Sequence, residues 1–151
     1  MKASTKKINY PIAIGVGVIT SIAISIVMII ATKTGVSPFP KPVGLAFVQL
    51  FLPKAPLPLG LLFHTLYVTF WSVIYITVFK KKNFLNALWL ALALWLVVLI
   101  IFFPILGWGF FGLAISPKLI VASLVPHALF AVILWQTSLL IFAKKVSEGQ
   151  K

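Results

Sequence analysis

The sequence predicts an all-α fold, an integral membrane four-helix bundle arranged as two similar helical hairpins. Of its 151 residues 62% are hydrophobic, and the mean hydropathy is +1.15. Such values are typical of membrane proteins rather than of soluble domains. Four apolar stretches each reach the roughly 20 residues that cross a bilayer. The predicted spans, in a single transmembrane domain over residues 1–151, are residues 11–31, 59–79, 84–103 and 119–142.

The first span carries a stripe of small side chains. Ala13, Gly17, Ser21 and Ser25 are each four residues apart, so they share one face of a helix. Small residues let helix backbones approach closely in lipid. We therefore expect this face to pack on another helix, in this protein or in a partner, and packing within the protein is favoured.

The first outer loop, residues 32–58, carries six prolines in two groups. Between these groups lies the apolar segment 43–52, which would be about 15 Å long as a helix. This length is too short to cross a bilayer. An interfacial or re-entrant segment is expected here.

The connection between the third and fourth spans, residues 104–112, is apolar and rich in glycine. Irregular backbone at membrane depth must be buried in protein or meet water. We therefore expect this segment to fold back over the outer end of the bundle, with Trp108 at the level of the lipid headgroups.

The placement of lysines predicts the orientation. Nine lysines lie in the N-terminal arm, the turn after the second span and the C-terminal tail, whereas four lie on the other side. Cytoplasmic segments carry an excess of lysine, so both termini of this multi-pass protein are predicted to be cytoplasmic, in the inner or plasma membrane. Because the lysines flank the spans, the net charge of +12 predicts anionic lipid headgroups as partners and no nucleic acid.

The two histidines occupy corresponding places in the second and fourth spans. Residues 64–67 (His-Thr-Leu-Tyr) align with residues 127–130 (His-Ala-Leu-Phe), and a lysine cluster begins sixteen or seventeen residues after each histidine. Because each unit contains two spans, direction is preserved and the pattern indicates a parallel internal repeat. His64 and His127 are then expected at matched depth in the membrane.

Three hypotheses account for this pair, since an unpaired polar side chain inside a membrane is costly. The first is a structural hydrogen bond to Thr65, Ser123, Tyr67 or a backbone carbonyl. The second is axial ligation of haem b, or separate binding of chlorin pigments, by neutral imidazoles. The third is a metal or proton site, although two histidines alone make a weak metal site.

The haem hypothesis implicates further residues. Tyr67, Phe130 and Trp135 would contact the macrocycle around the axial ligands His64 and His127. A lysine near the outer surface, either Lys54 or Lys118, would meet the propionates. Axial ligand type and burial would then set the redox potential of the iron.

The composition narrows the chemistry. The chain has no cysteine, and its one acidic residue, Glu148, lies in the C-terminal tail. Disulfides, iron–sulfur clusters and cysteine-ligated zinc within this chain are thereby excluded. No metal ligand set is predicted beyond the iron of the haem hypothesis. Because no catalytic constellation is recognisable, no catalytic residues are predicted and a role other than an enzyme is favoured.

Several short motifs resemble those of the YagU-like group of small four-helix membrane proteins, whose molecular role is poorly defined. They are the small-residue first span ending in Val27-Met28, the proline-bearing outer loop, the glycines of residues 104–112, and the His-x-x-aromatic units at His64 and His127. The resemblance covers most of the chain. It implies the four-span layout and no particular reaction.

Three classes of function follow from these observations. The leading hypothesis is a non-catalytic accessory or scaffolding subunit of a larger membrane complex, with other membrane subunits as partners. The alternative is a subunit for electron transfer or light capture that binds haem b or chlorin through His64 and His127. A small channel or transporter is the third hypothesis.

Overall fold

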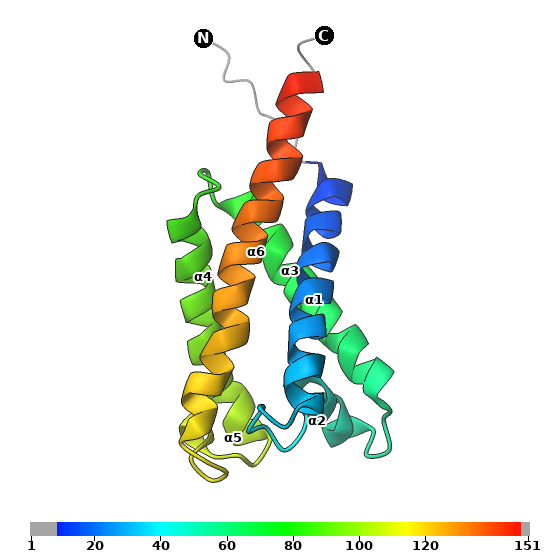
Figure 1. The fold of residues 1–151 in the computed structure, drawn as a ribbon, viewed down its shortest axis with the longest axis vertical. Coiled ribbons are helices and arrows are strands. Elements are labelled where there is room, and N and C mark those ends of the chain that lie inside the picture. The colour runs from blue at the N-terminus through cyan, green and yellow to red at the C-terminus, as the bar shows by residue number, and fades with distance from the viewer. Residues whose placement is uncertain (1–8, 149–151) are drawn as a thin grey trace.

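The computed structural model of the protein describes residues 9–148, with their side chains up to residue 141. Every element in this part of the chain is helical (Figure 1). In order they are α1 (Tyr10–Lys33), α2 (Val43–Phe51), α3 (Leu57–Val78), α4 (Phe84–Val97), the π-helical turn η1 (Val98–Phe102), α5 (Phe103–Ile105), the 3-10 turn η2 (Phe110–Gly112) and α6 (Lys118–Glu148).

Four helices in the described part of the chain are long and apolar enough to cross a membrane. These stretches are Tyr10–Lys33, Leu57–Val78, Phe84–Ile105 and Lys118–Ile141. The prediction of a multi-pass, all-helical membrane protein with four apolar helices is thus confirmed. The predicted ends differ from the observed ones by a few residues, because capping groups place the helix starts. Asn9, for example, accepts a hydrogen bond from the Ile12 N–H at 3.3 Å and so starts α1 at Tyr10.

The four long helices form a splayed bundle. α1 packs along both α3 and α6, and α4 packs along α6, whereas α3 and α4 make few contacts with each other. α3 crosses the bundle at a slant, and the start of α1 lies at the same end as the end of α6 (Figure 1). α2 and α5 lie at the opposite end. The helix rotations place isoleucines of α1 such as Ile19, Ile22 and Ile26 on the outside, as suits a lipid-facing surface.

The small-residue stripe of α1 lies against α3. Ala13, Gly17 and Ser21 are buried, and a Cβ added to Gly17 would lie 2.6 Å from the Thr69 Cα. The Ser21 hydroxyl donates a hydrogen bond to Thr65 Oγ1 at 3.0 Å. Small side chains therefore permit the close approach of α1 and α3 within the protein.

The apolar segment of the first outer loop forms α2, which docks on the start of α3. A Cβ on Gly60 would lie 2.6 Å from the Leu45 Cα, and one on Gly44 would lie 2.7 Å from the Gly60 oxygen. Only glycine permits these two helices to meet so closely. Gln49 closes the loop, since its amide donates to the Ala55 oxygen at 3.0 Å. The position of α2 relative to a membrane surface stays a prediction.

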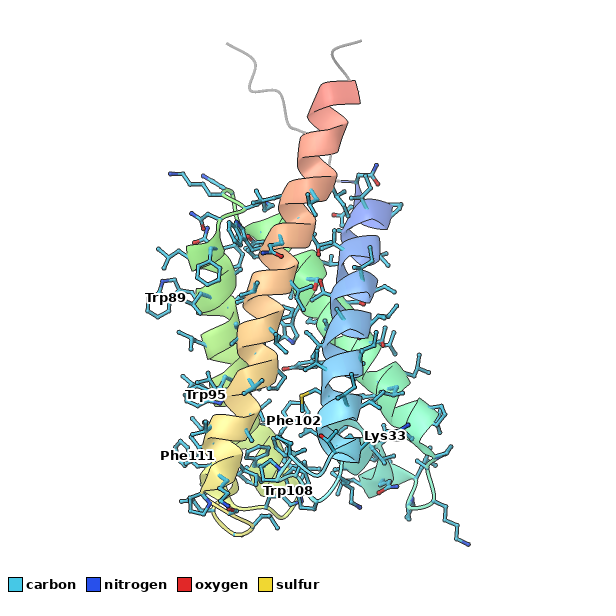
Figure 2. All side chains as sticks on the ribbon, in the orientation of Figure 1. Lys33, Trp89, Trp95, Phe102, Trp108 and Phe111 are labelled. Carbon is cyan, nitrogen blue, oxygen red and sulfur yellow. The ribbon has the colours of Figure 1, made fainter. Side chains whose placement is uncertain are left out.

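The second outer connection folds onto the end of the bundle. Pro104 lacks the N–H that would bond the Ile100 carbonyl, and the π-helical turn η1 lies just before it. Gly112 has a φ of 77°, and a Cβ there would lie 2.8 Å from the Leu119 Cβ. Trp108 is 6% exposed and packs on Phe103 with ring centroids 5.4 Å apart (Figure 2), and its expected position at the level of the lipid headgroups stays a prediction. The apolar loop buries this ring in protein.

Candidate functional site: a cavity between the two histidine helices

His64 of α3 and His127 of α6 line one cavity. This cavity has a volume of about 240 Å³ and lies among α1, α3, α4 and α6, with α2 and the loop before it completing the wall. The two histidines thus border the same space, while the internal repeat that pairs them stays a prediction. Tyr67 and Phe130, each three residues after its histidine, also line it.

His127 is held by its own helix. Its Nδ1 lies 2.7 Å from the backbone oxygen of Ser123. Because a carbonyl oxygen can only accept a hydrogen bond, Nδ1 carries the proton and Nε2 carries the free lone pair. No partner for Nε2 occurs in the described part of the chain. The neighbouring Pro126 lies inside α6 and removes one N–H from this turn.

Trp95 of α4 supports the same turn of α6. Its Nε1 donates to Ser123 Oγ at 3.0 Å and lies 3.3 Å from the Ile120 oxygen. The Ser123 hydroxyl in turn donates to the Ile120 oxygen at 3.0 Å. Trp95 lies between α4 and α6, whereas Trp89 points away from the bundle (Figure 2). Sequence reasoning missed Trp95, although a buried indole N–H that needs an acceptor was the available signal.

His64 is bonded differently from His127. Neither of its ring nitrogens has a hydrogen-bond partner in the described structure, and its Nε2 is fully buried. The residue four positions earlier is Gly60, the contact point of α2. The His64 side chain thus lines the cavity without a hydrogen bond of its own in the described structure. A buried polar group left without a partner costs about 1–3 kcal/mol.

Two more residues that line the cavity, Tyr67 and Trp71, carry a buried polar atom with no hydrogen bond in the described structure, namely the Tyr67 hydroxyl oxygen and the Trp71 Nε1. Their rings meet edge-on with centroids 6.2 Å apart. His64, Tyr67 and Trp71 are spaced at i, i+3 and i+7, so they share one face of α3. Sequence reasoning assigned Trp71 to no site hypothesis. Its position seven residues after His64 was a signal that could have indicated it.

Aromatic rings of α3 and η1 line the wall beside these groups, and Phe47 of α2 packs against them from outside the cavity lining. Phe47 of α2 stacks on Phe63 of α3 with ring centroids 4.8 Å apart, and it lies 5.2 Å from Phe102. Tyr67 meets Phe102 edge-on at 5.7 Å. Phe102 and Val98 come from the π-helical turn η1, and both line the cavity. The widened turn thus places two apolar side chains where α3 and α4 diverge.

Other residues of the haem hypothesis lie elsewhere. Trp135 does not line the cavity and packs on Phe84 with ring centroids 5.5 Å apart. Lys54 and Lys118 are also absent from the lining, whereas Lys33 at the end of α1 contributes to it (Figure 2). Lys33 is exposed, so it marks the outer mouth of the cavity. Ser25 of the small-residue stripe lines the cavity as well.

Two side chains at this site, His64 and His127, are candidate metal ligands. Among the described residues, histidine, cysteine, aspartate and glutamate nowhere gather in a group of three or more. The cavity is a largely apolar space whose wall includes the side chains of His64, Tyr67, Trp71 and His127, which we call the polar quartet. Lys33 and hydroxyl side chains such as those of Ser25 and Ser123 line it as well.

The chain matches no protein-family model, no curated protein and no solved structure. The resemblance to the YagU-like group accordingly stays a prediction from short motifs.

Proposed function

We propose that this protein binds a small, largely apolar molecule inside the membrane, in the cavity between α3 and α6, with the polar part of the ligand at the polar quartet. One observation carries the proposal. Three side chains on one face of α3, those of His64, Tyr67 and Trp71, line one cavity, and each carries a buried polar atom that has no hydrogen bond in the described structure. Buried polar groups in proteins are nearly always hydrogen-bonded, and a ligand would supply the partners.

The shape and lining of the cavity support a ligand of modest size. Its volume of about 240 Å³ lies just below the roughly 300–1,000 Å³ of common ligand pockets. Apolar walls with a few convergent polar groups are the usual composition of such pockets. The cavity suits a small molecule, or the polar end of a longer one whose apolar part continues into the lipid.

The test is extraction of the protein with its bound molecule. Protein purified gently from its native membrane is extracted with organic solvent, and the extract is analysed by mass spectrometry. We expect one compound in near-stoichiometric amount, reduced at least several-fold in His64→Ala and His127→Ala. Leu66→Ala and Val125→Ala are the matched controls, because these residues of α3 and α6 are 61% and 49% exposed. An extract containing bulk lipid alone from all variants would contradict the proposal.

Haem b is a second candidate, favoured by the hydrogen bond of His127. A metal-bound histidine normally donates its other ring N–H to a carboxylate or a backbone carbonyl, as His127 does to Ser123. His64 and His127 would then hold the haem iron, and the haem would supply one-electron chemistry. Haem stands second because Tyr67 Oη and Trp71 Nε1 would gain no acceptor from an axially bound iron. A dithionite-reduced absorption spectrum decides the matter, since a sharp haem band must disappear in both histidine variants.

The proposed orientation follows the lysine bias, with the start of α1 and the end of α6 on the cytoplasmic side and the cavity mouth outside. The chain has no cysteine, so Lys81→Cys and Ser116→Cys each introduce a single thiol, at opposite ends of the bundle. We expect an impermeant maleimide to label Ser116→Cys in intact cells and Lys81→Cys only after permeabilisation. The reverse pattern would overturn this orientation.

The accessory-subunit role and the channel or transporter role stay predictions from the sequence. Either is compatible with ligand binding, because a bound molecule can be presented to a partner or moved across the bundle. Co-purification of a stoichiometric membrane protein would favour the first role, and liposome flux would favour the second.

A further inference from the structure

Lys33, at the mouth of the cavity, restricts the chemistry of the ligand, in a way that rests on the proposed function and goes beyond it. It is the one charged residue that lines the cavity in the described structure. Its ammonium group has no hydrogen bond or ion pair in the part of the chain that the structure describes. Lys41, by contrast, donates a hydrogen bond to Gln49 Oε1 at 2.8 Å. The cavity thus has a cation at its mouth that no described residue pairs.

The sequence offers no acidic side chain for this cation. Its one acidic residue is Glu148, the last residue of α6. The end of α6 lies at the opposite end of the bundle from the end of α1, where Lys33 is (Figure 1). An anion that meets Lys33 therefore comes from outside the chain. Because Lys33 lines the cavity, that anion can belong to the molecule that the cavity holds.

The separation of Lys33 from the polar quartet sets the length of such a molecule. The Ser21 hydroxyl bonds Thr65, the neighbour of His64, at 3.0 Å, so Ser21 marks the level of His64 on α1. Lys33 is twelve residues further along this helix, which corresponds to about 18 Å. Between these two levels three apolar side chains of α1 line the cavity, namely Ile24, Met28 and Ile29. A molecule that reaches from one level to the other is elongated, with an apolar middle.

An acidic group suits the mouth better than a neutral or a basic one. Lys33 is exposed, so a carboxylate beside it keeps part of its water and avoids the cost of a buried charge. Hydrogen bonds between ionised partners are roughly twice as strong as those between neutral ones, and Lys33 would repel an ammonium group. The cavity volume of about 240 Å³ favours one chain over the two of a phospholipid, because common ligand pockets begin at roughly 300 Å³.

We propose that the ligand is a single-chain amphiphilic acid, with its carboxylate at Lys33 and its chain inside the cavity. The chain would pass the apolar side chains of α1 and carry, at its inner part, the polar group that the polar quartet binds. One molecule would then have a charged end at the membrane surface and an uncharged polar group in the interior.

The test compares an acid with its own methyl ester, since the pair differs in charge and shares the chain. The probes are ω-hydroxydodecanoic acid and its methyl ester. Dissociation constants come from the shift of the unfolding midpoint with probe concentration in nanodiscs of phosphatidylcholine. We expect Lys33→Gln to weaken binding of the acid about three- to fivefold, as loss of one partly exposed ion pair would do. Binding of the ester should stay unchanged.

Two further variants assign this effect to the charge of Lys33. Lys33→Arg keeps the charge and should retain the wild-type constant for the acid. Lys54→Gln is the matched control, because Lys54 is exposed and does not line the cavity. It should leave both constants unchanged. If Lys54→Gln weakened the acid as much as Lys33→Gln does, the effect would belong to the general surface charge, and the proposal would be overturned.

The remaining outcomes separate this proposal from the binding function. The extract of the native protein should contain a single-chain acid. An anionic phospholipid in its place would assign Lys33 to the bilayer headgroups and overturn the proposal, while the binding function would stand. An unchanged constant for the acid in Lys33→Gln would have the same meaning. If neither probe binds and no compound is extracted from the native protein, the proposed function itself fails.

Discussion

The two histidine-bearing helices, α3 and α6, share a sequence pattern and differ in how the pattern is bonded. In both, a histidine and an aromatic ring three residues later line the cavity. The residue four positions before the histidine is Ser123 in α6 and Gly60 in α3. His127 bonds the Ser123 carbonyl at 2.7 Å, whereas His64 has no hydrogen bond in the described structure.

The surroundings of the two turns explain this difference. The α6 turn contains Pro126 and is braced by Trp95 of α4 through Ser123. The α3 turn is occupied by α2, whose backbone approaches Gly60 directly. One turn supports its histidine by a hydrogen bond, whereas the other is covered by the packing of α2. One imidazole at the cavity is therefore held by its own helix, and the other has no hydrogen bond in the described structure.

The largest expected change in stability comes from disrupting the contact of α2 with α3. Gly60→Ala introduces a Cβ 2.6 Å from the Leu45 Cα, with backbone rather than flexible side chain as its neighbour. We expect a loss of about 3 kcal/mol in the free energy of unfolding, because overpacking against backbone cannot relax easily. Chemical unfolding in detergent measures it. The control is Gly15→Ala, whose added Cβ meets no atom within 4 Å, and an equal loss there would disprove the packing argument.

A second prediction concerns the sign of the effect at each histidine. In protein stripped of ligand, His64→Phe should raise the free energy of unfolding by about 1–2 kcal/mol, because it removes a buried polar group without a partner. His127→Phe should lower it by about 1 kcal/mol, because it removes the bond to Ser123. Unfolding midpoints of the two variants, compared under the same conditions, check this. Changes of the same sign would show that the two histidines are bonded alike.

The brace behind His127 gives a smaller effect. Trp95→Phe removes the indole donor to Ser123 Oγ and should lower the free energy of unfolding by about 1 kcal/mol. Trp89→Phe, on the exposed face of the same helix (63% exposed), is expected to be neutral in the same unfolding experiment. Should both tryptophans prove equally tolerant, the brace would have no energetic role.

The smallest expected free-energy change concerns the contact between α1 and α3. A double-mutant cycle with Ser21→Ala and Thr65→Val isolates the hydroxyl pair, whose oxygens are 3.0 Å apart. We expect a coupling free energy of about 0.6 kcal/mol, the usual value for interhelical hydrogen bonds in membranes. A coupling of zero would mean that the close approach at Gly17 holds these helices together without the hydroxyls.

Much of the fold could be read from the chain alone. Four apolar stretches of sufficient length determine four helices, because a backbone in lipid must satisfy its own hydrogen bonds. The spacing of Ala13, Gly17 and Ser21 indicated a packed face on α1. Each of these is a property of one helix, which the sequence determines locally.

Only the tertiary structure decided which side chains meet at the site. Trp71 rather than Trp135 borders the cavity, and Lys33 rather than Lys54 or Lys118 marks its mouth. The spans are apolar on every side, so no hydrophobic periodicity sets their rotation. Their rotation depends instead on close contacts between helices, such as that of Gly17 with Thr69. The sequence therefore determines where these helices lie along the chain and how long they are, and helix packing determines what they enclose.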